Sequence, residues 1–72
     1  MARIVVTGAT GMIGSAVCRR LLALGERPVG LTREPATAAA KLPEVEWHAW
    51  HDAQATAPPA AALAGAAGVI HL

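Results

Sequence analysis

The sequence predicts an α/β fold of the Rossmann type, in which a parallel sheet is built in the order βαβαβαβ. A short β-branched run ends at a turn with glycines at positions 8, 11 and 14. Directly after that turn, the apolar pattern changes from continuous to helical. Short apolar runs then alternate with Ala-rich segments along the rest of the chain. This alternation predicts right-handed crossovers, and we expect the strand order 3-2-1-4.

The composition limits the class of protein. The chain has 72 residues, of which 54% are hydrophobic and 15% charged, with a net charge of +1. It is too apolar for a disordered chain and too neutral for a nucleic-acid binder, and its length suits one small domain or part of one. No apolar run has the length of a membrane span or the form of a signal peptide, so no membrane association is expected. With a single cysteine, Cys18, the expected location is cytoplasmic.

The first strand and helix follow from the pattern around the turn. Residues 3–7 form a short run in which 4–7 are all β-branched, which is typical of a strand buried on both faces. A helix is predicted from Met12 until Gly25 ends it. Its apolar residues at helical spacing, which we expect to face the sheet, are Ile13, Ala16, Val17, Leu21 and Leu24.

The next elements are shorter. Residues 28–32 are predicted as the second strand, and Pro35 opens a helix that continues to about Leu42. Residues 45–50 then alternate, which predicts an edge strand with one wetter face. Its two faces are Val45, Trp47 and Ala49 on one side and Glu46, His48 and Trp50 on the other.

The last part of the chain is predicted to complete half of a Rossmann sheet. A polar loop over 51–57 precedes a helix that begins at the two prolines 58–59 and takes in the Ala-rich stretch 60–67, with Gly65 and Gly68 marking its exit. Residues 69–72 are predicted to form the fourth strand. Two crossover helices would then cover one face of the sheet and the third the other, and the fourth strand would keep an open edge. We therefore expect either the N-terminal half of a larger protein or self-association through that edge.

The glycine turn predicts a phosphate-binding site. Gly8 can take the backbone angles of a tight turn, Gly11 leaves no side chain between the backbone and a pyrophosphate, and Gly14 allows close packing of the helix. The first helical amides, near Met12 and Ile13, would face the phosphates, and Thr10 lies within the same turn. The alternative is a strand-to-helix turn that needs glycine for its shape alone.

The end of the second strand favours NADP(H) over NAD(H). Arg33 offers a planar fork of donors for a phosphate, and Thr32 adds a hydroxyl. Glu34 leaves NAD open, because its carboxylate would suit free ribose hydroxyls. Lys41 is a further candidate for the phosphate, although a lysine late in a surface helix is more often solvated. The alternative for Arg33 is also a solvated charge.

Other candidates are weaker. Asp52 follows the third strand at the carboxyl side of the sheet, where it could accept a hydrogen bond from the adenine amino group or simply cap the loop. His48 and His51 stand three apart without further ligands, so no metal site is predicted. Cys18 is expected to be a packing residue, because no neighbouring His or acid would activate it.

Three segments together resemble the extended and atypical short-chain dehydrogenase/reductase superfamily, namely 6–14, 31–33 and 68–72. The chain is most similar to the NAD-dependent epimerase/dehydratase-like proteins, and among them to a sugar-nucleotide epimerase subgroup. The resemblance spans essentially the whole chain, with Met12 in place of the family's usual aromatic residue. It implies that the fourth strand runs on beside the nicotinamide ribose, which brings Leu72 to the cofactor.

The resemblance implies an NADP(H)-dependent oxidoreductase or epimerase in which a Tyr and a Lys four residues apart activate the substrate. The chain contains no Tyr. We therefore assign 1–72 to the N-terminal part of a dinucleotide-binding domain that is not catalytic by itself. The alternatives are a non-catalytic NAD(P) sensor that regulates a partner, or an inactive fragment. A Tyr-x-x-x-Lys segment after Leu72 would favour the enzyme.

Overall fold

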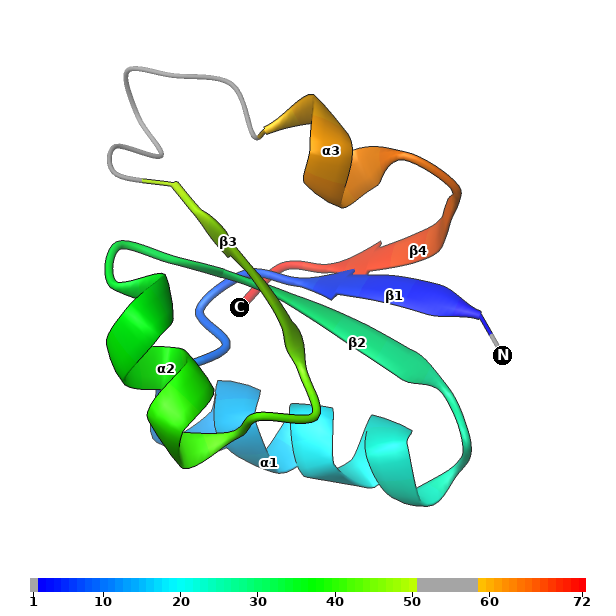
Figure 1. Ribbon diagram of the computed structural model, residues 1–72. Coiled ribbons are helices and arrows are strands. Elements are labelled where there is room, and N and C mark those ends of the chain that lie inside the picture. Colours follow the sequence, from blue (N-terminus) through cyan, green and yellow to red (C-terminus); the bar gives the residue numbers. More distant parts are fainter. Residues whose placement is uncertain (1, 51–58) are drawn as a thin grey trace.

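The computed structural model describes residues 2–50 and 59–72, which form one parallel sheet with helices between the strands (Figure 1). The strand order is β3-β2-β1-β4, as the sequence predicts. The strands are β1 (Arg3–Val6), β2 (Arg27–Thr32), β3 (Glu46–Ala49) and β4 (Ala66–Ile70). The helices are α1 (Met12–Ala23), α2 (Pro35–Lys41) and α3 (Ala60–Leu63). The loop predicted over 51–57 lies outside the described residues.

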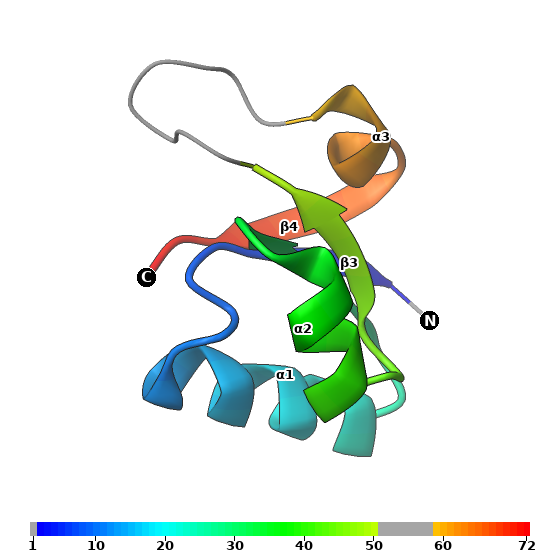
Figure 2. The same ribbon diagram turned by 60° about the vertical axis from the view of Figure 1, so that its left-hand side comes forward.

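The helices cover the two faces of the sheet unequally. Helices α1 and α2 lie on one face and α3 on the other (Figures 1 and 2). This arrangement confirms the expected crossovers, in which the first two turn one way from β1 and the third turns the other. Two clusters of buried side chains result. The cluster on the α3 face contains Val5, Val29, Leu31 and Ala62, and the other contains Val6, Ala9, Cys18 and Val45.

The rotation of α1 differs from the prediction. Val17 and Leu21 pack toward the sheet as predicted, but Gly14, Cys18 and Leu22 join them. Ile13 and Leu24, which were expected on the same side, are 68% and 57% exposed. The cause is Gly14, where an added Cβ would lie 2.0 Å from the carbonyl oxygen of Gly8. Only glycine permits this approach, and it fixes which face of the helix meets the sheet. Cys18 is a buried packing residue, as expected, and burial raises the pKa of its thiol.

A second close contact joins β2 to β3. The ring of Trp47 lies directly over Gly30, where a Cβ would come within 2.3 Å of the ring. The Trp47 indole nitrogen donates a hydrogen bond of 2.9 Å to the carbonyl oxygen of Leu42, after α2. Trp47 therefore packs on the sheet face and also connects α2 to the edge strand.

The end of the chain differs from the expected segments. Helix α3 ends at Leu63 rather than extending through the Ala-rich stretch, and β4 covers Ala66–Ile70 instead of the predicted 69–72. Gly65 adopts a φ of 68° between them. Ala66 pairs with Arg3 of β1, so backbone pairing in the sheet overrides the helix preference of alanine. Gly68 accordingly lies within the strand.

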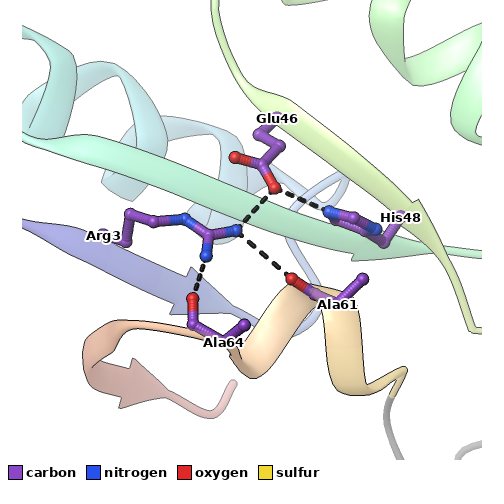
Figure 3. A network of polar contacts seen from close by, with 5 residues as sticks. All are labelled: Arg3, Glu46, His48, Ala61 and Ala64. Atoms are coloured by element: carbon purple, nitrogen blue, oxygen red, sulfur yellow. Dashed lines mark hydrogen bonds and ion pairs between the residues drawn. The ribbon is translucent and has the colours of Figure 1, made fainter.

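Arg3 holds α3 against the sheet through the network in Figure 3. Its guanidinium donates hydrogen bonds to the carbonyl oxygens of Ala61 and Ala64, and its Nη2 lies 2.5 Å from Oε2 of Glu46 on β3. His48 Nε2 lies 2.7 Å from the same carboxylate oxygen. The hydrogen bond from His48, together with Arg3, lowers the pKa of Glu46. The network therefore connects β1, β3 and α3.

Replacing Gly14 with alanine should destabilise the protein. The new methyl group would overlap the backbone of Gly8, so either α1 or the turn must move, and we expect a loss of about 3 kcal/mol in the free energy of unfolding. Urea denaturation followed by circular dichroism measures the loss. Gly68→Ala is the matched control, because its Cβ would meet only the end of Ile4 at 3.9 Å. The control should stay within about 1 kcal/mol of the wild type, and equal losses in the two variants would contradict the packing argument.

The Glu46 network predicts a pH dependence of stability. Because folding lowers the pKa of Glu46, its contribution is fully present above the ordinary glutamate pKa of about 4.3 and is lost as the pH falls through the lower, folded value. Glu46→Gln should therefore be less stable than the wild type at pH 7, and the difference should shrink at pH 3. Thermal unfolding at both pH values measures it. A difference that grows on acidification would reverse the assigned sign.

Candidate functional site

A cleft of about 820 Å³ opens at the carboxyl end of the sheet. It lies where β1 and β2 end, and α1, α2 and the last residues of the chain complete its walls. Strand ends of a parallel sheet meet at one edge, and the crevice beside that edge is where ligands bind in open α/β sheets. The cleft therefore collects residues from segments that are far apart in the sequence.

The turn after β1 forms one wall. Gly8 has a φ of 62°, a backbone conformation that favours glycine, and its carbonyl oxygen accepts a 3.1 Å hydrogen bond from Gly11 N–H. The first hydrogen bond of α1 runs 2.8 Å from Ser15 N–H to Gly11. The amides at 12–14 precede it and so have no partner within the helix. Gly11 is the N-cap and supplies no side-chain cap.

The predicted phosphate residues divide into two groups. Gly8 and Thr10 line the cleft. Gly14 is buried beneath the turn, and the side chains of Met12 and Ile13 point to solvent with exposures of 90% and 68%. What residues 11–14 can offer a ligand is therefore backbone, through amides at a helix N-terminus.

The end of the chain lies beside the same turn. The Thr7 hydroxyl oxygen accepts a 3.1 Å hydrogen bond from Leu72 N–H and lies 2.8 Å from His71 Nδ1. The Thr7 amide donates to the carbonyl oxygen of Ile70 at 2.9 Å. Thr7, which the sequence reasoning did not single out, thus holds His71 and Leu72 at the cleft. The one feature of the sequence that could have indicated Thr7 is its position between the first strand and Gly8.

The end of β2 forms the opposite wall, where Thr32, Arg33 and Glu34 all line the cleft. The Thr32 hydroxyl accepts a 3.2 Å hydrogen bond from Glu34 N–H, which fixes the chain as it enters α2. Arg33 and Glu34 are both exposed. The cleft therefore holds a guanidinium and a carboxylate from neighbouring positions in the sequence.

Two helical side chains that were given little or no role also line the cleft. Arg19 comes from α1, and Lys41 comes from the last turn of α2. Trp47 and Trp50 contribute apolar surface. The sequence shows that both residues are charged, but it does not show where their side chains lie. That depends on the rotation of each helix about its axis, and for α1 the predicted buried side was partly wrong.

Three further residues named from the sequence are Asp52, His48 and His51. Asp52 and His51 lie outside the described residues. His48 contacts Glu46 on the α3 face. Across 2–50 and 59–72, no three His, Cys, Asp or Glu side chains are grouped as a metal site would require. No helix in those ranges is long and apolar enough to cross a membrane.

Comparison with known proteins identifies the family. The model of the NAD dependent epimerase/dehydratase family matches residues 4–72. No curated protein matches the chain at a significant level. The family match indicates a nicotinamide dinucleotide as the cofactor, which accords with a glycine turn at a helix N-terminus and an open cleft at the carboxyl end of the sheet. Because the match covers nearly the whole chain, the protein belongs to the NAD dependent epimerase/dehydratase family.

Proposed function

We propose that the chain binds NADP(H) in the cleft, with the pyrophosphate at the Gly8 turn and the phosphorylated ribose at the end of β2. One observation carries the proposal: the Gly8 turn and the pair Thr32 and Arg33 line a single cleft. A dinucleotide must reach both places at once, because its pyrophosphate and its adenosine ribose are covalently joined.

The turn suits a pyrophosphate for two reasons. The amides of Met12, Ile13 and Gly14 are free of helical partners, and the positive end of the α1 dipole favours an anion there. Gly11 has no side chain to obstruct the approach, and the Thr10 hydroxyl lines the cleft as a further donor. In this proposal the phosphates bind mainly to backbone.

Arg33 would distinguish NADP(H) from NAD(H). Its guanidinium can form paired hydrogen bonds to a phosphate, and Thr32 stands next to it. Glu34 represents the NAD alternative, because its carboxylate would accept hydrogen bonds from free ribose hydroxyls but would repel a phosphate. A comparison of the two cofactors therefore tests the assignment directly.

The other parts of the proposal concern the far ends of the cofactor. Leu72 would lie beside the nicotinamide ribose, and Asp52 would contact the adenine. The family's chemistry is hydride transfer at the nicotinamide, activated by the Tyr and Lys pair that the resemblance implies. Since the chain contains no Tyr, we propose cofactor binding without catalysis for these 72 residues.

Self-association through β4 stays a prediction. This strand lies at the edge of the sheet, next to β1 alone among the described strands, and Val69 on it is 57% exposed. Unpaired strand edges with apolar side chains tend to add another strand.

The cofactor assignment predicts that wild-type protein binds NADPH more tightly than NADH in a calorimetric titration. Arg33→Gln should raise the Kd for NADPH about tenfold, because a hydrogen bond to a charged group contributes about 1.5 kcal/mol or more. The Kd for NADH should change less than about twofold, since NADH lacks the phosphate. Equal binding of NADPH and NADH by the wild type would contradict the role of Arg33.

Glu34→Gln provides the complementary variant. If Arg33 faces the phosphate, removing the neighbouring negative charge should leave NADH binding unchanged and tighten NADPH binding by a few-fold, about 0.5 kcal/mol. A loss of NADH binding would instead place Glu34 on the ribose hydroxyls.

A further inference from the structure

Three positively charged side chains from different elements line the proposed cofactor cleft. Arg19 comes from the middle of α1, Arg33 follows β2, and Lys41 ends α2. All three are exposed. Glu34 is the one acidic side chain among the described residues that line the cleft. The ion pairs recorded between described residues, those of Glu46 with Arg3 and His48, involve none of the three cations. This end of the cleft is therefore positive.

The packing of the helices places two of these cations, Arg19 and Lys41, at the cleft. On α1, Arg19 follows buried Cys18, so the contact of Gly14 with the turn that sets the helix rotation also sets the direction of Arg19. On α2, Lys41 lies one turn beyond Thr37 and three residues after buried Ala38. Residues four apart share one side of a helix, and Thr37 and Lys41 both line the cleft.

Hydroxyl groups near these cations are not equivalent. The Ser15 hydroxyl lies one turn before Arg19 and donates a 3.2 Å hydrogen bond to the carbonyl oxygen of Met12. Its proton is thus engaged by the backbone, which leaves Arg19 as the donor that α1 offers here. The Thr32 hydroxyl accepts from Glu34 N–H and keeps its own proton for a ligand.

We propose that Arg19 and Lys41, together with Arg33, bind the ribose phosphate that distinguishes NADP(H) from NAD(H). This inference rests on the proposed function and adds two specificity residues from separate helices. A phosphate carries nearly two negative charges, and one exposed arginine in water gives it limited stabilisation. Several cations around one cleft raise the local potential together and outweigh the repulsion from Glu34.

The competing interpretation is that Arg19 and Lys41 are solvated surface charges. The chain offers a matched control for this. Arg20 is the neighbour of Arg19 on α1, is equally an exposed arginine, and does not line the cleft. Arg19→Gln and Arg20→Gln remove the same charge from adjacent positions on one helix, so a general charge effect must appear in both.

The test is calorimetric titration of the 72-residue protein with NADPH and with NADH, in about 50 mM and about 200 mM salt. Arg19→Gln and Lys41→Gln should each raise the Kd for NADPH about three- to fivefold, and the double variant should raise it further. The Kd for NADH should stay within about twofold in every variant, which also shows that the cleft is intact. Arg20→Gln should bind both cofactors as the wild type does, and NADPH binding should depend less on salt in the double variant.

The outcomes separate this inference from the function it rests on. If Arg33→Gln weakens NADPH binding while Arg19→Gln and Lys41→Gln do not, the inference is wrong and the proposed function stands. Equal losses in Arg19→Gln and Arg20→Gln would also overturn it, in favour of a general charge effect. If the wild type binds neither cofactor, or binds both equally, the proposed NADP(H) function fails and this inference fails with it.

Discussion

The backbone contact between Gly14 and the carbonyl group of Gly8 is the constraint on which the site depends. A Cβ at position 14 would lie 2.0 Å from that oxygen, so the helix can approach the turn this closely only because residue 14 is glycine. This approach brings the N-terminus of α1 to the carboxyl end of β1. It also fixes the rotation of the helix, which buries Cys18 and turns Arg19 toward the cleft. A single steric requirement thus positions both the unpaired amides at the N-terminus of α1 and a cationic side chain.

The other walls of the cleft are held by polar contacts between segments that are distant in sequence. Thr7 connects the end of β1 to the end of the chain by accepting a hydrogen bond from Leu72 N–H. On the opposite side, Trp47 packs over Gly30 and donates to the carbonyl oxygen of Leu42, which joins β3 to β2 and to the end of α2. Each tie uses a main-chain group as partner. The walls of the cleft therefore depend on a few side chains that reach main-chain groups of segments which the strand order brings together.

The network around Arg3 plays the corresponding role on the other face. Helix α3 is only four residues long, and a helix of that length has little stability of its own. Arg3 donates to two of its carbonyl groups and is itself paired with Glu46, which His48 also contacts (Figure 3). The interaction stabilises a short, apolar segment against a sheet whose opposite face is occupied by the larger helices.

By itself, the sequence determined the class of fold, the strand order and the glycine turn between β1 and α1. Each of these depends on local patterns, namely β-branched runs, a change of period and glycines at 8, 11 and 14. It also indicated Arg33, because the end of the second strand is a fixed place in such folds. The inferences about the fold hold because steric and periodic rules act over a few residues and need no knowledge of distant partners, whereas the role of Arg33 stays a proposal.

Only the tertiary structure decided which side of α1 is buried, where β4 begins, and that Thr7, Arg19 and Lys41 meet at the cleft. The apolar pattern of α1 permits more than one rotation, and the contact with Gly8 selects one of them. Ala66 favours a helix locally, but pairing with Arg3 of β1 makes it part of a strand. In both cases the deciding contact joins residues that the sequence does not show to be neighbours, so it could not be predicted from local pattern.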